Sequence, residues 1–117
     1  MIMPIQESPF IQELESTLWR LWEDDDVSIE DLCHAMNISR TQLHRKLKTL
    51  KNQSTSQFIN ELKLKKAAKV LSTYELSISE VSFECGFKDP SYFSQLFMKK
   101  YACSPTEFRE KSKMLIP

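Results

Sequence analysis

Glycine, paired cysteines and long apolar runs are scarce in this sequence, and each shortage excludes a class of protein. The 117 residues include one glycine, whereas β-hairpins commonly need glycine at positive φ, so a sheet protein is disfavoured. No apolar stretch approaches the roughly 18 residues that cross a bilayer, and no basic-then-apolar leader precedes a cleavage site. The sequence therefore predicts an all-α, cytoplasmic protein without membrane contact.

The three cysteines, Cys33, Cys85 and Cys103, are odd in number and far apart. They match neither the paired spacing of a zinc site nor a disulfide framework, so we expect reduced, buried side chains. A metal site that combines a cysteine with His34 or His44 is an alternative, although no C-x-x-C or H-x-x-x-H spacing supports it. The sequence predicts no metal and no other cofactor.

The charged residues are unevenly distributed, although the formal net charge is zero. Residues 1–38 carry one basic and nine acidic residues, whereas residues 39–117 carry fifteen basic and seven acidic ones. Within residues 39–69 the one acid is Glu61, so this segment is a candidate phosphate footprint. Basic helix faces that are merely solvated are the alternative. The acidic run 23–26 is expected to form a solvated helix end and loop, not a cation site.

Seven positions carry the residues that start helices. A Ser or Asp oxygen can accept hydrogen bonds from the amides of a first turn, and a Glu or Gln three residues later can close a capping box. After each start, large apolar residues recur at the spacing of one buried helix face. We expect about seven helices, starting at Ser8-Pro9, Ser28, Ser39, Ser54, Ser77, Asp89-Pro90 and Ser104.

The second half of the sequence repeats the first. Residues 28–58 match residues 77–108, at an offset of 49 up to a turn and of 50 after it. Each copy is predicted to be a helix, a short turn and a helix, which indicates a duplicated structural unit. Asn37 and Gly86 fall at the two turns, where a helix-turn-helix needs a residue that tolerates the left-handed conformation. An ordinary helical hairpin could use the same residues, so the polar faces of the second helices must distinguish the two.

The second helix of the first unit is predicted to bury a leucine face, formed by Leu43, Leu47 and Leu50. Thr41, His44 and Arg45 then point outward, where side chains could contact DNA bases. Arg45 can bond a guanine edge bidentately, and Thr41 and His44 can donate or accept. A catalytic role for His44 is disfavoured, because the spacing places no nucleophile or carboxylate beside it.

The second helix of the second unit repeats this division. Phe93 and Phe97 turn inward, and Ser91, Ser94 and Gln95 are predicted to contact bases, with Gln95 suited to adenine. Basic residues on or beside the helices of both units, and on the long helix expected between them, are predicted to contact DNA phosphates: Arg40, Lys48, Lys63, Lys88, Lys99 and Lys100.

A long helix is predicted between the two units, over about residues 55–72. At about 1.5 Å per residue it spans about 27 Å, compared with about 34 to 36 Å between successive turns of the major groove. A stiff rod of this length could set both recognition helices into successive grooves on one side of a duplex. The expected divisions are an acidic first helix, a first helix-turn-helix, a linker helix, and a second helix-turn-helix with a closing helix, at residues 1–26, 27–53, 54–73 and 74–117.

Two stretches resemble a known family. Residues 86–109, GFKDPSYFSQLFMKKYACSPTEFR, resemble the C-terminal DNA-binding domain of AraC/XylS transcription regulators. Residues 39–71, SRTQLHRKLKTLKNQSTSQFINELKLKKAAKVL, are similar to its first unit and linker helix, particularly in output domains of hybrid two-component regulators. The resemblance covers about residues 27–111. It implies that each unit inserts its second helix into the major groove through the six base-contacting residues named above, and that the bound domain activates transcription through RNA polymerase.

The sequence departs from the family pattern at three positions. Gln95 stands where the family often has arginine, and Asn52 and Ala102 stand where glycine is common. Asparagine tolerates a left-handed helix cap. Ala102 either adopts that conformation at a cost of about 1 kcal/mol or caps its helix in another way.

Together these features predict a sequence-specific, nucleoid-associated DNA-binding domain. An enzyme is disfavoured, because nothing assembles a nucleophile, a base and oxyanion donors. We expect the domain to be the output part of a larger regulator whose sensor or receiver domain lies outside this chain. One of Trp19 and Trp22 is expected in the core and the other against that missing domain. A helical module that binds an acidic protein surface is the alternative.

Overall fold

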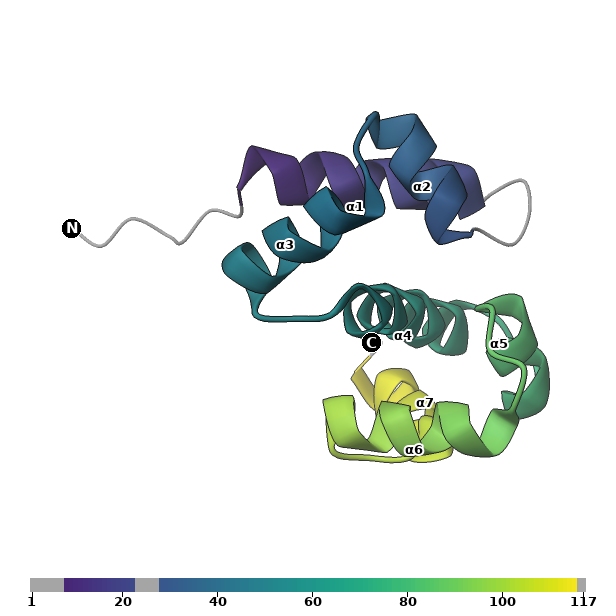
Figure 1. The fold of residues 1–117 in the computed structure, drawn as a ribbon. Coiled ribbons are helices and arrows are strands. Elements are labelled where there is room, and N and C mark those ends of the chain that lie inside the picture. Colours follow the sequence, from purple (N-terminus) through teal and green to yellow (C-terminus); the bar gives the residue numbers. More distant parts are fainter. Residues whose placement is uncertain (1–7, 23–27, 116–117) are drawn as a thin grey trace. The chain divides into compact units, whose positions relative to one another are not determined.

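The computed structural model of this chain describes residues 8–22 and 28–115, with side chains up to residue 113. Within these residues it contains seven helices and no strand, which confirms the all-α prediction (Figure 1). The acidic run 23–26 lies outside the described residues. The helices are α1 (Pro9–Trp22), α2 (Ile29–Met36), α3 (Arg40–Lys51), α4 (Thr55–Thr73), α5 (Ile78–Glu84), α6 (Pro90–Tyr101) and α7 (Pro105–Leu115).

All seven helices start at the predicted capping residues. Reciprocal capping boxes join Ser28 to Asp31, Ser39 to Gln42 and Ser77 to Glu80, and the same paired bonds join Ser54 to Gln57 and Ser104 to Glu107. The Ser8 hydroxyl oxygen accepts hydrogen bonds from the Phe10 and Ile11 amides, and the Asp89 carboxylate accepts one from the Ser91 amide. These local bonds explain why the helix starts could be predicted without tertiary information.

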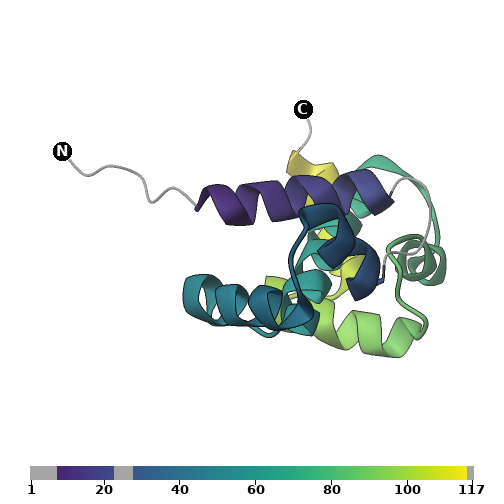
Figure 2. The ribbon, with the colours of Figure 1, turned by 45° about the horizontal axis from the view of Figure 1, so that its top comes forward.

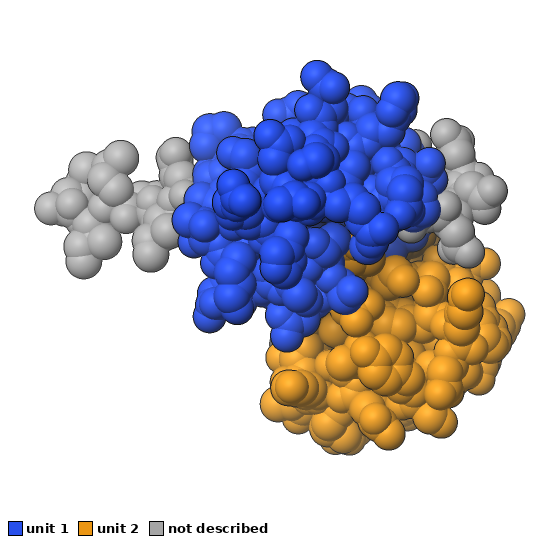
Figure 3. All heavy atoms as spheres, viewed as in Figure 1, with its two compact units in different colours: residues 1–58 blue, residues 59–117 orange. Residues whose placement is uncertain are grey.

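The chain divides into two compact units, residues 1–58 and residues 59–117, with the division inside α4 (Figure 3). In the first unit α1 packs on α2 and α2 packs on α3, an arrangement that two views show (Figures 1 and 2). The apolar faces of these helices and of the first turn of α4 are buried. Its buried hydrophobic residues are Ile11, Leu14, Leu18, Leu32, Cys33, Leu43, Leu47 and Phe58.

In the second unit α5 packs on α6 and α6 packs on α7. One cluster of buried side chains joins α4, α5 and α6: Leu64, Ala67, Leu71, Val81, Cys85, Phe87, Phe93 and Phe97. Phe97 makes three aromatic contacts in and beside this core, because its ring lies 5.7 Å from Phe93, 4.6 Å from Tyr101 and 5.3 Å from Phe108 between centroids. Such pairs stabilise beyond their buried area by about 0.5 to 1.5 kcal/mol each.

The turns of the two helix-turn-helix units are built alike. Asn37 and Gly86 both have positive φ, 55° and 85°, as the sequence predicted. Two backbone bonds close each turn at matching positions: Ile38 N to Cys33 O (3.0 Å) and Asn37 N to His34 O (3.1 Å) in the first unit, and Phe87 N to Ser82 O (2.9 Å) and Gly86 N to Phe83 O (3.1 Å) in the second. The duplication therefore extends from the sequence to individual hydrogen bonds.

Burial in the structure differs from the sequence prediction at Leu50, Trp19 and Trp22 and agrees with it at the three cysteines. Leu50, expected to point inward, is 43% exposed, because it lies in the last turn of α3 just before the chain leaves the helix at Asn52. Trp19 and Trp22 are both half-buried and their rings lie 5.2 Å apart, so neither is a fully buried core residue. All three cysteines are free and buried as predicted, and burial raises the pKa of Cys85 to about 11.

Candidate nucleic-acid interface

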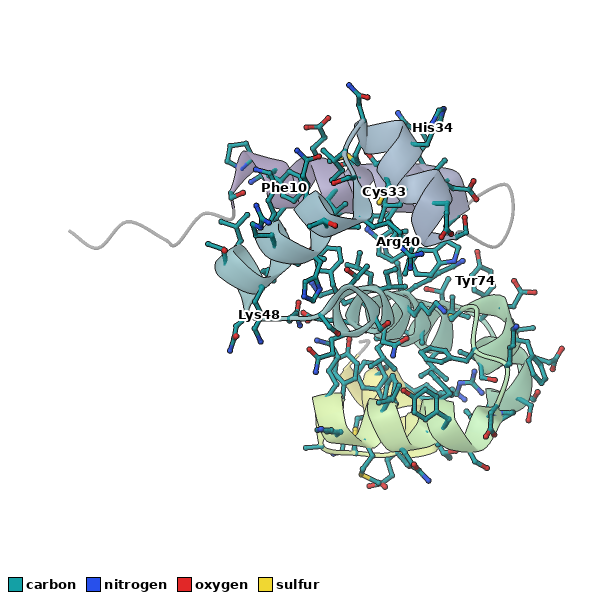
Figure 4. All side chains as sticks on the ribbon, in the orientation of Figure 1. Phe10, Cys33, His34, Arg40, Lys48 and Tyr74 are labelled. Atoms are coloured by element: carbon teal, nitrogen blue, oxygen red, sulfur yellow. The ribbon has the colours of Figure 1, made fainter. Side chains whose placement is uncertain are left out.

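The first candidate surface is the outer face of α3. Leu43 and Leu47 are buried beneath it, and the three predicted base-contacting residues Thr41, His44 and Arg45 are all exposed on it. Arg40 begins the helix and Lys48 lies in its last turn, so cations stand toward both ends of this face (Figure 4). Uncharged and cationic donors thus share one exposed surface above a fixed apolar face.

A hollow of about 400 Å³ lies beside this face, within the first unit. The first residues of three helices line it, together with Thr41 and His44 from α3: Ile29, Arg40, Thr41, His44, Ser54, Thr55 and Ser56. Helix starts carry partial positive charge and hydroxyl groups donate to phosphate oxygens. The Arg40 guanidinium and the hydroxyl groups of this lining are therefore suited to hold a phosphate beside the outer face of α3.

Arg40 forms a salt bridge with Glu30. Its Nη1 lies 2.8 Å from Oε1 of Glu30, the second residue of α2, and both side chains are about two-thirds exposed. An exposed pair of this kind contributes about 0.2 to 1 kcal/mol. DNA phosphate could therefore compete for the Arg40 guanidinium at small cost.

The second candidate surface lies on α6. Phe93 and Phe97 are buried, Ser91 and Gln95 are exposed, and Ser94 is half-buried. The predicted outward face is thus present, with Ser94 partly covered at its margin. Lys88 and Lys99 are exposed beside it.

Two predicted phosphate contacts have acceptors inside the second unit. The Lys100 ammonium lies 3.7 Å from the Glu61 carboxylate and 5.4 Å from the centroid of the Tyr101 ring. The Lys63 ammonium donates to the Gly86 carbonyl at 3.0 Å. Lys63 therefore binds the turn of the second helix-turn-helix, a role that the sequence reasoning missed.

Arg109 of α7 is a further residue whose role the sequence did not indicate. Its Nε donates to the Leu71 carbonyl at 3.2 Å and its Nη2 to the Tyr74 carbonyl at 3.3 Å. These bonds satisfy carbonyl groups at the end of α4. Its place in the family pattern was visible in the sequence, but these long-range partners were not.

Two helix-turn-helix units with polar second helices define an all-α DNA-binding domain, and comparison with known proteins identifies its family. A family described as "Helix-turn-helix domain" matches residues 32–111. The chain therefore belongs to the AraC-type helix-turn-helix family, which is a family of DNA-binding transcription-regulator domains.

Two curated relatives show the range of proteins that contain such a domain. Histidine kinase P4 of Formosa agariphila is 40% identical over 76 residues, which is 65% of this chain and 6% of that protein. HTH-type transcriptional activator RhaS of Enterobacter sp. is 29% identical over 119 aligned residues, 94% of this chain and 43% of that protein. The chain therefore spans less than half the length of either relative.

Solved structures with similar folds agree with the family. A transcriptional regulator from Chromobacterium violaceum, described as AraC-type, has a TM-score of 0.76 and 25% identity, with 90% of this chain and 96% of that one covered. The C-terminal domain of AraT, a response regulator from Geobacillus stearothermophilus, has a TM-score of 0.71 and 25% identity, with coverage of 92% and 88%. Within the described part of the chain, no helix is both long and apolar enough to span a membrane.

Proposed function

We propose that this chain binds double-stranded DNA sequence-specifically, with α3 and α6 in successive major grooves, and thereby activates transcription as the output domain of a larger cytoplasmic, nucleoid-associated regulator. Thr41, His44 and Arg45 of α3, and Ser91, Ser94 and Gln95 of α6, contact bases in this proposal. Arg40, Lys48, Lys88 and Lys99 contact phosphates, and Lys100 joins them if phosphate displaces Glu61. Lys63 is not among the proposed phosphate contacts, because it donates to the Gly86 carbonyl.

One observation carries the proposal: in both units the second helix has a polar outer face above a buried apolar face. Leu43 and Leu47 under the first face correspond to Phe93 and Phe97 under the second, and all four are fully buried. A recognition helix needs this arrangement, because its buried side fixes the orientation of the side that meets base edges. The 19 residues of α4 span about 28 Å, close to the groove repeat of about 34 Å.

The named relatives support the larger assembly. A histidine kinase and the C-terminal domain of a response regulator both contain a similar sequence or fold, which is the expected pattern for an output domain joined to a sensor or receiver. The likeness to a transcriptional activator supports activation. RNA polymerase as the partner is our proposal. The sensor or receiver domain would lie outside this chain.

Selection of duplexes from a random DNA pool tests the proposal directly. We expect the chain to enrich two short conserved sequence blocks about 10 to 10.5 base pairs apart, centre to centre. If no sequence is enriched and binding to duplex DNA does not depend on salt, DNA binding is rejected. A helical protein-interaction module would then be favoured.

A further inference from the structure

We propose that Lys63 and Lys66 of α4 position the second recognition helix by holding the turn that precedes it, and that they are not phosphate contacts. This inference rests on the proposed function and deepens it, because it names residues that control base reading by α6 without touching DNA.

The Lys63 ammonium binds the turn between α5 and α6. It donates to the Gly86 carbonyl at 3.0 Å in a partly buried bond, and it lies 5.4 Å from the centroid of the Phe87 ring. Gly86 is the residue with φ of 85° that reverses the chain at this point. A single side chain of α4 thus contacts both the hinge residue and the buried aromatic residue that follows it.

Lys66 repeats the contact almost one helical turn further along α4. Its ammonium donates to the carbonyl of Glu84, the last residue of α5, at 3.4 Å. Backbone amides already bond the three preceding carbonyls of α5, those of Val81, Ser82 and Phe83. The two lysines therefore donate to the Glu84 and Gly86 carbonyls, which accept no backbone bond among the described residues of this turn. The C-terminal end of α5 carries a partial negative charge, which favours cations there.

The helix that carries these lysines is itself fixed in the same core as α6. Leu64, Ala67 and Leu71 of α4 are buried in one cluster with Phe93 and Phe97 of α6. The lysines thus connect a rigid face of α4 to the turn that sets the direction of α6. Loss of a lysine would leave α6 packed in the core but would hold its orientation toward DNA less firmly. Base contacts tolerate positional errors of only about 0.5 Å.

Matched lysine variants separate positioning from phosphate contact. Lys63→Met and Lys66→Met each remove one positive charge, as does the control Lys69→Met, whose side chain is exposed on the same helix. For each variant we would measure the affinity ratio between the selected duplex and duplexes altered in the base pairs that α6 reads, and the slope of log affinity against log salt. We expect Lys63→Met to lower the ratio about tenfold, equivalent to about 1.4 kcal/mol, with an unchanged slope. Lys69→Met should keep the ratio, and Lys63→Arg, which retains a donor, should restore most of it.

Two results would overturn the inference. A slope lowered by about 0.9 with the ratio preserved would make Lys63 a phosphate contact. The affinity ratio would be measured at a temperature where Lys63→Met is folded. A preserved ratio together with a lower melting temperature would show that Lys63 only stabilises the fold. If Lys63→Met does not fold, Lys66→Met carries the same test, because the bond of Lys66 is exposed. A wild-type chain that binds no duplex would reject the proposed function instead.

Discussion

At the scale of single residues, the outer face of α3 divides between side chains suited to bases and side chains suited to phosphates. Arg45 and Lys48 are both exposed and lie three residues apart on the same helix. The arginine fork can match a guanine edge, whereas a lysine ammonium is a point charge. Loss of Arg45 should therefore reduce base discrimination, whereas loss of Lys48 should reduce affinity for all sequences.

Substitution of each residue by alanine tests this difference. We expect Arg45→Ala to lose about 1 to 3 kcal/mol of discrimination at one base pair, and Lys48→Ala to weaken binding to all sequences alike and lower the salt slope by about 0.9. Dissociation constants on a set of single-base variant duplexes at two salt concentrations give both quantities. Unchanged base preference in Arg45→Ala would refute its assignment.

Among the residues that the structure describes, Ala102 is the one residue other than glycine and asparagine with positive φ. It ends α6 with φ of 60°, in the left-handed region where a β-carbon is unfavourable. We expect Ala102→Gly to raise the free energy of unfolding by about 1 kcal/mol. Ala35→Gly, at an exposed position inside α2, should lower it by about the same amount. Urea unfolding of both variants provides the measurement, and no gain in Ala102→Gly would show that the strain is relieved elsewhere.

At the scale of elements, the helix starts are held by short-range bonds. The Ser77 hydroxyl oxygen accepts from the Glu80 amide at 3.1 Å, and the Glu80 carboxylate accepts from the Ser77 amide at 3.0 Å. We expect Ser77→Ala to destabilise the protein by about 0.5 to 2 kcal/mol. Ser79→Ala, exposed in the same first turn, should change stability by less than about 0.5 kcal/mol. Equal losses in thermal unfolding of the two variants would contradict a specific cap at Ser77.

The same box makes α5 sensitive to acid. The pKa of Glu80 is lowered from 4.5, mainly because the Ser77 backbone amide donates to its carboxylate and secondly because of the Ser77 side chain. A folded-state pKa below the unfolded value adds stability above the unfolded pKa, which is lost as the pH falls through the folded pKa. We therefore expect the stability difference between wild type and Glu80→Gln to shrink as the pH is lowered below 4.5. Unfolding curves across that range would contradict the box if the difference stayed constant.

Local features of these elements were predictable, and contacts between distant elements were not. Ser77 and Glu80 lie within one turn, and the positions of Asn37 and Gly86 followed from the repeat, so sequence alone located caps and turns. The partner of Lys63 is 23 residues away, and the spacing of charges along a helix carries no information about such a carbonyl. The predicted burial of Leu50 was wrong for a related reason, since periodicity does not reveal at which residue a helix stops being covered by other elements.

At the scale of the whole molecule, the zero net charge conceals a strongly basic segment. Contact with five phosphates would release counterions and give a log-log salt slope of about −4.5 on duplex DNA. A titration between about 50 and 200 mM salt measures this slope. A slope near zero would contradict a phosphate-contacting surface and would favour a protein partner.

The central claim is that α3 and α6 engage one duplex simultaneously, and a spacing experiment tests it most directly. The chain would be titrated against the selected duplex and against the same duplex with 5 base pairs, about half a helical turn, inserted between the two conserved blocks. We predict that the insertion lowers the affinity to that of a duplex with a single block, and that Arg45→Ala and Gln95→Ala each weaken binding to the uninterrupted duplex. Equal affinity for the interrupted and uninterrupted duplexes would contradict the claim.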